Sequence, residues 1–393
     1  GKPIMGKINY TVWSDVFVCP QCSEEIIFFN EAFDQKNKRV RDNFSCPNCG
    51  KLLTKRFLER ALINVYDEGL EQAVTQARQV PVLINYSVGE KKFEKKVDEY
   101  DLELLKGIEE GKISYWYPIS PIPEGEESSR NIPLGITHVH QFFTKRNLWA
   151  ISCCMATIDN VKDVRLRNTL IFTFEQLILG MSKLARYVPR HYSQVNQFLS
   201  GTLYIASQVV EVTPWYIINK RKLANLIKTY SQTRTNLVYT SCSSANDLLL
   251  DDNTIDYIFV DPPFGGNLMY SELNFLWESW LKVFTNNKPE AIENSFQGKG
   301  IQEYQQLMEQ CFREYYRVLK PGRWMTVEFH NSKNQIWNAI QEAINRAGFV
   351  VADTRVLDKK QGTFKQLTST TAVKQDLIIS AYKPTREFEK SFA

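Results

Sequence analysis

The sequence predicts an α/β fold, because its last third alternates strand-like and helix-like segments in the pattern of one half of a doubly wound sheet. Two further features accompany this core. Two Cys-x-x-Cys pairs lie within the first 50 residues and indicate an inserted ribbon, and amphipathic helical patterns fill a region from about 140 to 230. At 393 residues, the chain is long enough for two or three domains of ordinary size.

The ribbon is predicted over residues 1–60 from its cysteines. Cys19 and Cys22 form the first pair, Cys46 and Cys49 form the second, and 23 residues separate the pairs. Two residues between cysteines allow a tight turn to direct both thiolates at one ion, and a second such turn completes a closed tetrahedral Zn²⁺ site. A redox-active pair is the alternative, but the duplicated turn favours structural zinc. A basic loop between the pairs leaves contact with nucleic acid open; it contains Lys36, Lys38, Arg39 and Arg41.

Cysteine usage and hydropathy also indicate the compartment. The four remaining cysteines are scattered, as is typical of small buried side chains. No secretory signal is evident, and the apolar stretch 169–181 is interrupted by Glu175 and Gln176, so we expect no membrane span. A cytoplasmic protein with a metal site fits this pattern better than a secreted disulfide scaffold.

Residues 61–135 are predicted to form an insert and a linker, with target recognition as a candidate role. The pattern over residues 56–79 is helical, residues 80–97 form a hairpin around Gly89-Glu90, and residues 99–110 form a short helix. The stretch 115–130 is rich in proline, serine and aromatic residues, which marks a linker or an ordered surface loop.

Residues 136–235 are predicted to form a basic helical region. The formal net charge of the whole chain is only +4, but residues 141–235 contain thirteen Lys and Arg against four Asp and Glu. Such concentrated positive charge favours a polyanionic partner such as DNA. A solvated helical face is the structural alternative.

The α/β core is predicted over residues 236–393. Its first strands are expected at 237–243 and 257–260, with helices at 270–284 and 303–319, the latter ended by the Lys-Pro-Gly of residues 320–322. A strand, a helix and two further strands follow, and we expect the last two strands to be antiparallel.

A conspicuous corner follows the strand pattern IDYIFV directly: Asp261, Pro262, Pro263 and Phe264. Proline fixes φ and removes a backbone donor, so this pair must end the strand, and a simple turn explains that much. In open α/β sheets, however, ligands bind at the carboxyl ends of the strands, where this carboxylate and this ring project. The sequence therefore predicts a binding site as well as a turn.

With its neighbours, this corner resembles a known family. The corner follows YIFV, with SANDLLLDDNTID before it and LKPGRWMTVEFHNS after it, and this arrangement is similar to the DNA amino-methyltransferases that act on adenine N6 or cytosine N4. The stretch FGGNLMYSELNFLWE, joined to a Cys-x-x-Cys ribbon, resembles more narrowly the bacterial adenine-specific DNA methylases that carry a zinc ribbon. The resemblance implies a Rossmann-like methyltransferase sheet, of which the carboxyl-terminal half is evident here. It also implies S-adenosylmethionine as cofactor and DNA as substrate, with adenine N6 preferred to cytosine N4.

The resemblance also implies a role for each residue of the corner. The exocyclic amine of adenine is a poor nucleophile because its lone pair is delocalised into the ring, and two acceptors that hold its hydrogens favour rehybridisation. By resemblance, the carboxylate of Asp261 and the carbonyl of Pro262 are these acceptors, and Phe264 stacks on the extruded base. The two prolines, Pro263 included, stiffen the corner so that the acceptors are already in place.

The sequence departs from the family in its cofactor motif. The family binds S-adenosylmethionine on a glycine-rich turn after its first strand, and no such turn is evident in this sequence. We therefore expect this chain to be the carboxyl-terminal portion of a longer protein, or to need a partner chain that carries the motif. Ser244, after the predicted strand 237–243, lies where relatives contact the cofactor and is the candidate cofactor contact. An RNA methyltransferase and a catalytically inactive nucleic-acid-binding module are the alternatives.

Overall fold

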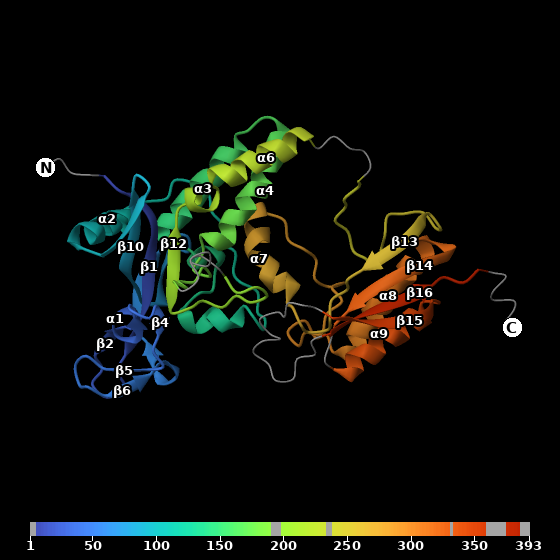
Figure 1. Ribbon diagram of the computed structural model, residues 1–393, viewed down its shortest axis with the longest axis horizontal. Helices are drawn as coiled ribbons and strands as arrows, with labels where there is room; N and C mark the ends of the chain where they lie inside the picture. Colours follow the sequence, from blue (N-terminus) through green and yellow to red (C-terminus); the bar gives the residue numbers. More distant parts are fainter. Residues whose placement is uncertain (1–4, 190–197, 233–237, 331–332, 359–374, 386–393) are drawn as a thin grey trace. The chain divides into compact units, whose positions relative to one another are not determined.

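The computed structural model describes residues 5–189, 198–232, 238–330, 333–358 and 375–385 (Figure 1). The chain forms two compact units. Unit 1 consists of Gly1–Arg234 and Glu272–Phe284, and unit 2 consists of Thr235–Ser271 and Thr285–Ala393. The chain therefore leaves unit 1, returns to it for one short segment, and then leaves it again. Among the described residues, no helix has the length and hydropathy of a membrane span.

Unit 1 contains an antiparallel sheet. Its main strands are β1 (Lys7–Val18), β10 (Gln79–Val88), β11 (Lys91–Lys96) and β12 (Gln208–Val212). They lie in the order β11-β10-β1-β12, and the end of β1 also pairs with the short strands β2 (Glu25–Ile27) and β7 (Glu59–Arg60). The predicted hairpin is formed by β10 and β11, with Gly89 in the turn at a φ of +60° that favours glycine. Strand β1 thus connects this sheet to the cysteine-bearing segment.

Three small hairpins accompany the sheet. They are β3 (Phe33–Asp34) with β4 (Arg39–Val40), β5 (Asn43–Ser45) with β6 (Leu52–Thr54), and β8 (Leu62–Asp67) with β9 (Gln72–Ala77). The helix predicted over residues 56–79 is wrong, because β7, β8 and β9 lie there. The carboxylate of Asp67 accepts the backbone N–H groups of Gly69 and Leu70 at 3.0 and 3.1 Å. This local turn reverses the chain where a helix would have continued.

The remaining part of unit 1 is helical. Its described helices are α1 (Phe28–Ala32), α2 (Glu99–Glu110), α3 (Lys145–Asp159), α4 (Val164–Gly180), α5 (Pro214–Ile217), α6 (Lys220–Gln232) and most of α7 (Tyr270–Leu281), with 3₁₀ turns at η1 (Lys55–Phe57), η2 (Ser129–Leu134) and η3 (Val139–Phe142). The predicted helix 99–110 is confirmed as α2. Asp98 caps it by accepting the backbone N–H of Asp101 at 3.0 Å, and the Asp101 carboxylate accepts the N–H of Asp98 in return.

Helix α7 completes the core of unit 1, although it comes late in the sequence (Figure 1). Trp280 on α7 is fully buried. Its ring lies 5.7 Å from that of Phe174 and 5.9 Å from that of Phe143, both in edge-on arrangements that aromatic rings prefer. Unit 1 therefore depends for its packing on residues that follow the Asp-Pro-Pro-Phe corner.

Glu272, in the first turn of α7, is also held inside unit 1. It is 4% exposed, and its carboxylate accepts the backbone N–H groups of Glu126, Glu127 and Ser128 at 3.2, 2.8 and 3.0 Å, together with the Ser128 hydroxyl. A Cβ at Gly125 would lie 2.1 Å from the carboxyl carbon, so the loop is closely fitted to this group. The start of α7 is therefore anchored by a buried carboxylate.

We expect Glu272→Ala to lower the free energy of unfolding by about 2 kcal/mol, because buried backbone N–H groups lose their acceptor. Chemical denaturation followed by circular dichroism measures the change. Glu103→Ala, an exposed position on α2, is the matched control and should cost less than about 0.5 kcal/mol. Equal stabilities of the two variants would contradict the anchoring role.

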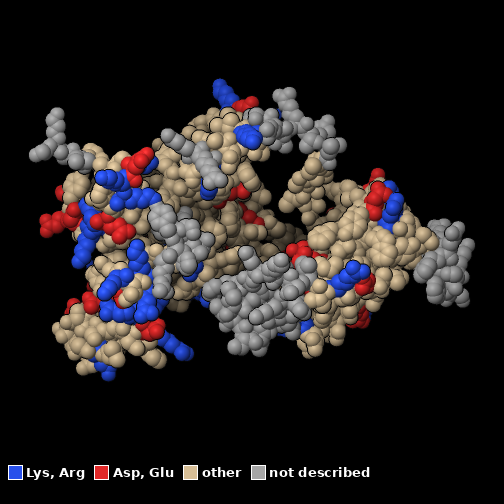
Figure 2. Space-filling model, in the orientation of Figure 1, with Lys and Arg blue, Asp and Glu red and all other residues tan. Residues whose placement is uncertain are grey.

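The basic residues predicted over 136–235 separate into internal and exposed groups. Lys145 Nζ lies 2.8 Å from the Glu68 carboxylate, and Arg146 pairs with Glu211, which is buried in the sheet. These two cations are paired with acids within unit 1. Figure 2 shows Lys and Arg side chains scattered over the visible face, several of them next to Asp or Glu. Described, exposed cations of the region include Lys162, Arg165, Lys222 and Lys228, whereas Arg190 and Arg234 lie outside the described residues.

Unit 2 contains a mixed sheet. Its strands are β13 (Ile255–Val260), β14 (Leu319–Phe329), β15 (Val350–Asp358) and β16 (Gln375–Tyr382). They lie in the order β13-β14-β16-β15, with β13 parallel to β14 and β16 antiparallel to both of its neighbours. Helix α8 (Ile301–Val318) precedes β14 and α9 (Asn334–Arg346) follows it. The α/β class and the antiparallel final pair are confirmed.

The two faces of this sheet differ. Helices α8 and α9 pack on one face, in a core that includes Met325 and Val327 of β14. The opposite face carries Tyr257, Phe259 and Trp324, which are 55%, 56% and 44% exposed. In the described part of unit 2, β13 is also the edge strand. A parallel edge and an apolar open face are unusual, because parallel sheets normally have both faces covered.

The strand predicted at 237–243 is wrong over its described part, residues 238–243. These residues are irregular and exposed, with Val238 at 74% and Tyr239 at 88%, and residue 237 lies outside the described part. β-Branched and aromatic residues favour a strand only where a neighbouring strand pairs with them. The helix that was predicted to end at residues 320–322 ends slightly earlier, because α8 ends at Val318. Residues 320–322 already belong to β14.

Candidate active site and metal centre

The Asp-Pro-Pro-Phe corner leaves the sheet at the carboxyl end of β13, as predicted. Because β13 and β14 are parallel, His330, directly after β14, lies at the same edge of the sheet. Asp261 is exposed, whereas the two prolines and Phe264 are half-buried. Burial raises the pKa of the nearby Tyr270 hydroxyl, and the negative charge of Asp261 raises it further. The corner therefore offers an accessible carboxylate beside a phenol that stays protonated.

Contacts within unit 2 hold the corner from two sides. The ring of Phe264 meets Phe329 edge to face at 5.3 Å between centroids and lies 6.2 Å from the ring of His330. On the other side, the hydroxyl of Tyr304 donates to the carbonyl of Pro263 at 2.6 Å. The aromatic ring and the proline backbone are therefore fixed by groups on β14 and α8.

The two positions after the corner, Gly265 and Gly266, require glycine for different reasons. Gly265 adopts a φ of +67°, which side chains disfavour. A Cβ at Gly266 would lie 2.8 Å from the carbonyl oxygen of Glu293, so this position must be small to let the 285–300 segment approach. The same segment is joined to the chain after the corner by the Asn294 amide, 3.1 Å from the sulfur of Met269. The corner is thus part of an ordered loop pair.

The four cysteines form the candidate metal centre. The sulfur atoms of Cys19, Cys22, Cys46 and Cys49 all lie within 4.8 Å of one another. The closest contacts across the two pairs are 3.6 Å for Cys22 with Cys46 and 3.8 Å for Cys19 with Cys49. A tetrahedral zinc ion with Zn–S bonds of about 2.3 Å requires sulfurs about 3.8 Å apart. The donor set and its spacing fit Zn²⁺.

Both cysteine pairs fold into the same turn. Ser23 N–H donates to the carbonyl of Cys19 at 2.9 Å, and Gly50 N–H donates to that of Cys46 at 3.1 Å. Ser23 and Gly50 also share a positive φ, at 58° and 70°. The two turns pack on a small aromatic core that includes the buried Phe17, Phe28 and Phe44. This core supplies little apolar area, so the module needs a further source of stability.

Residues 255–391 match the N6/N4 methyltransferase family model, described as DNA methylase. This segment belongs to the DNA methylase family. It contains the Asp-Pro-Pro-Phe corner, the four strands of unit 2 and both of the helices packed on them. The match confirms the family resemblance for this part of the chain. The four cysteines lie outside it, so the narrower resemblance to ribbon-bearing adenine methylases stays a prediction.

No curated protein matches the chain. Among solved structures, a protein of Thermus thermophilus described as a DNA modification methylase is 13% identical, covers 37% of this chain and 54% of its own, and has a TM-score of 0.21. An S-adenosylmethionine-dependent methyltransferase of Methanosarcina mazei is 12% identical over 43% of this chain and 80% of its own, with a TM-score of 0.23. This chain therefore spans about half the length of the Thermus protein. TM-scores of this size carry no weight for fold or function.

Ser244 precedes the DNA methylase segment, and its role as a cofactor contact stays a prediction. Its hydroxyl donates to the side-chain oxygen of Asn246 at 2.6 Å, and the Asn246 amide contacts Gln310 on α8. The strand that was expected to position Ser244 is not formed in residues 238–243.

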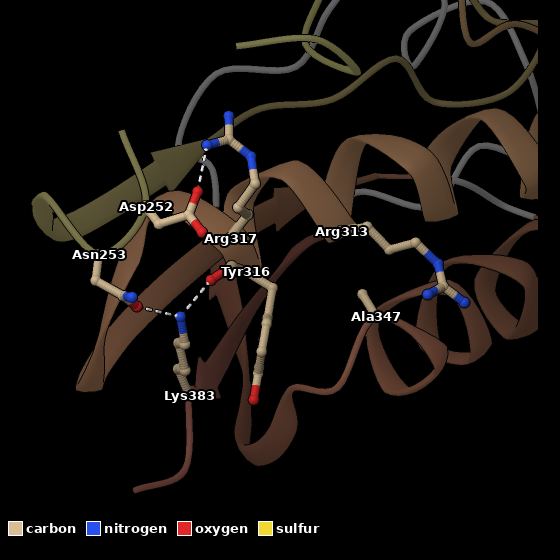
Figure 3. A pocket seen from close by; sticks show the side chains of 7 residues that line it. All are labelled: Asp252, Asn253, Arg313, Tyr316, Arg317, Ala347 and Lys383. Carbon is tan, nitrogen blue, oxygen red and sulfur yellow. Dashed lines mark hydrogen bonds and ion pairs between the residues drawn. The ribbon is translucent and has the colours of Figure 1, made fainter. Parts of the chain in front are cut away.

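A cavity of about 460 Å³ lies at the amino end of β13, opposite the corner (Figure 3). Lys383 points across it, and its ammonium donates to the Asn253 side chain and to the carbonyls of Tyr316 and Leu319 at 2.7, 2.6 and 2.7 Å. Cations are favourable at the carboxyl end of a helix, and Tyr316 and Leu319 form that end of α8. We interpret this cavity as the capped end of a helix. It is at the wrong edge of the sheet for methyl transfer.

Sequence reasoning missed two groups beside the corner of the DNA methylase segment. Tyr304 contacts Pro263 from 41 residues away. His330 Nδ1 lies 2.8 Å from the carboxylate of Asp376, which is 1% exposed. The only available signal for His330 was its place directly after a predicted strand, at the edge where ligands bind.

Proposed function

We propose that the protein transfers the methyl group of S-adenosylmethionine to an exocyclic amine of a base in DNA, preferably adenine N6. The observation that carries the proposal is the exposed carboxylate of Asp261, at the carboxyl end of a parallel strand in a segment of the DNA methylase family. This is the edge of an open α/β sheet at which ligands bind.

Each residue of the corner has a proposed part in the reaction. When bound, S-adenosylmethionine supplies an electrophilic methyl group. The carboxylate of Asp261 and the carbonyl of Pro262 accept hydrogen bonds from the two N–H groups of the amine, so that its lone pair is released from the ring and directed at the methyl group. The one proton that the amine loses on methylation passes to the Asp261 carboxylate and from there to solvent. The ring of Phe264 stacks on the target base, which must leave the duplex to reach this corner.

The proposal includes the other parts of the chain. The four cysteines hold a structural Zn²⁺, and the ribbon of residues 1–60 and the exposed cations of residues 136–235 contact DNA. The spacing of the sulfurs supports the first statement, and the exposed Lys162, Arg165, Lys222 and Lys228 support the second.

Methyl transfer from radiolabelled S-adenosylmethionine tests the function. In a preparation that also contains the segment proposed below to complete the cofactor site, we expect label in duplex DNA and much less in structured RNA, and nucleoside analysis of the product should show N6-methyladenine. N4-Methylcytosine would correct the target base, and label in RNA alone would correct the substrate. Binding of DNA without any transfer, under conditions in which the cofactor binds, would indicate an inactive nucleic-acid-binding module.

The fit of the cofactor to this chain is incomplete. An adenosine cofactor usually binds to a glycine-rich turn that follows a strand. No described strand of unit 2 is followed by such a turn, and no described strand pairs with the free edge of β13. Three features of unit 2 are typical of surfaces that further strands and helices cover. They are the free edge of β13, the open face with Tyr257 and Phe259, and the exposed residues 238–243. We propose that a polypeptide segment outside residues 1–393, in cis or as a partner chain, adds strands beside β13 and completes the cofactor site.

We therefore expect residues 1–393 alone to bind S-adenosylmethionine with a Kd weaker than about 1 mM, because only one side of the site is present. Isothermal titration calorimetry measures the affinity, and sedimentation measures the self-association expected of an open sheet edge. Addition of the segment encoded beside this chain should restore both affinity and turnover. Micromolar affinity together with DNA methylation by residues 1–393 alone would show that the site is already complete.

A further inference from the structure

Tyr304 on α8 makes a buried contact with the corner that the proposed reaction does not yet use. Its side chain is fully buried, and its hydroxyl lies 2.6 Å from the carbonyl oxygen of Pro263. Burial raises the pKa of this phenol well above its usual range, so it remains protonated and donates. This hydrogen bond ties α8 to the backbone directly before Phe264.

The corner has one soft backbone torsion at this point. The pyrrolidine rings fix φ of both Pro262 and Pro263, and a residue that precedes proline is restricted to extended ψ, which holds Pro262. The ψ angle of Pro263 has no such restriction. This angle sets the direction of the Pro263 carbonyl and, with it, the course of the chain into Phe264.

We propose that Tyr304 is a positioning residue for methyl transfer: its hydrogen bond to the Pro263 carbonyl fixes the one free torsion of the Asp-Pro-Pro-Phe corner. The inference rests on the proposed function of that corner. Phe329 and His330 hold the ring of Phe264 from the other side, at 5.3 and 6.2 Å between centroids. Without the hydroxyl, the peptide between Pro263 and Phe264 can rotate, and the acceptors and the stacking ring lose their mutual alignment. Losses of about 1 Å in such alignment reduce rates by about a hundredfold.

Tyr304→Phe tests the inference because it removes only the hydroxyl and keeps the buried ring. In the preparation that methylates DNA, with any completing segment present, we expect kcat to fall at least tenfold while KM for DNA changes less than twofold. Tyr315→Phe is the matched control: it lies on the same helix, and the described structure gives its hydroxyl no contact with the corner. We expect its kcat to equal that of the unchanged protein.

A spectroscopic measurement detects changes in the conformation of the corner without requiring any turnover. With 4-fluorophenylalanine at position 264 in residues 1–393, the ¹⁹F resonance should shift or broaden in Tyr304→Phe and stay unchanged in Tyr315→Phe. Replacement of Tyr304 by 4-aminophenylalanine, which retains a donor, should restore both the resonance and kcat.

The outcomes separate the inference from the proposed function. If the unchanged protein never methylates nucleic acid even with the completing segment present, the proposed function fails and the resonance still tests Tyr304. An unchanged resonance or an unchanged kcat in Tyr304→Phe would overturn the inference. Loss of the folded circular dichroism spectrum in Tyr304→Phe would also overturn it, because the hydroxyl would then support the whole unit and not the corner.

Discussion

Asp261→Ala should lower kcat for methyl transfer by a factor on the order of 10³, while the affinity for DNA changes less than about threefold. The expected loss is large because this carboxylate is proposed to act on the reacting amine, and interactions made mainly in the transition state affect kcat and not binding. Its exposure is consistent with this role, since an accessible carboxylate at the strand end contributes little to the packing of unit 2.

Asp256→Ala provides the matched control for this variant. Asp256 lies on β13 itself, and its exposed side chain pairs with Lys320 at 2.9 Å. The same chemical change therefore occurs on the same strand, away from the corner, and should leave kcat within about twofold, since exposed ion pairs contribute little. The assay is single-turnover methyl transfer, with DNA affinity measured separately by fluorescence anisotropy. Full activity of Asp261→Ala would reduce the corner to a turn.

Removal of the metal should have the second large effect. Structural zinc contributes on the order of 10 kcal/mol to small modules of this kind, and the core around Phe17, Phe28 and Phe44 is too small to replace it. We expect one zinc ion per chain, and we expect Cys46→Ser or chelation to unfold the ribbon. Strand β1 should keep its pairs with β10 and β12, which lie outside the cysteine turns.

Elemental analysis measures the zinc content, and hydrogen exchange measures the local unfolding. Cys242→Ser, at an exposed cysteine outside the cluster, is the control and should change neither. Purified protein that contains no zinc and still protects the amides of residues 19–54 from exchange would contradict a structural metal centre.

The chemistry of the chain was predictable where it depends on local spacing. Two residues between cysteines form the same turn in any surrounding fold, so Cys19, Cys22, Cys46 and Cys49 could be grouped from sequence. The position of Asp261 after a strand was predictable for a similar reason, since consecutive prolines must end a strand. The family of residues 255–391 follows from that corner and its flanking segments.

The errors occurred where distant parts of the chain decide the structure. Residues 56–79 have an acceptable helical pattern, but the turn at Asp67 and pairing between β8 and β9 override it. Residues 237–243 have strong strand propensity, and their described part remains irregular because none of the described strands pairs with it. The pairing of β1 with β12, about 200 residues later, and the contact between Tyr304 and Pro263 leave no local signal in the sequence.

The return of the chain to unit 1 has a consequence for synthesis on the ribosome. A nascent chain that ends at Arg234 contains almost all of unit 1 but lacks Trp280 and Glu272, so a cavity remains among Phe143 and Phe174, and the loop at Glu126–Ser128 has no carboxylate. Native packing of the first unit must therefore wait until the corner and α7 have emerged, by which time the first strand of the second unit is also outside the exit tunnel. Because unit 1 is formed from two separate stretches of the chain, a single cut cannot separate the units into two complete halves.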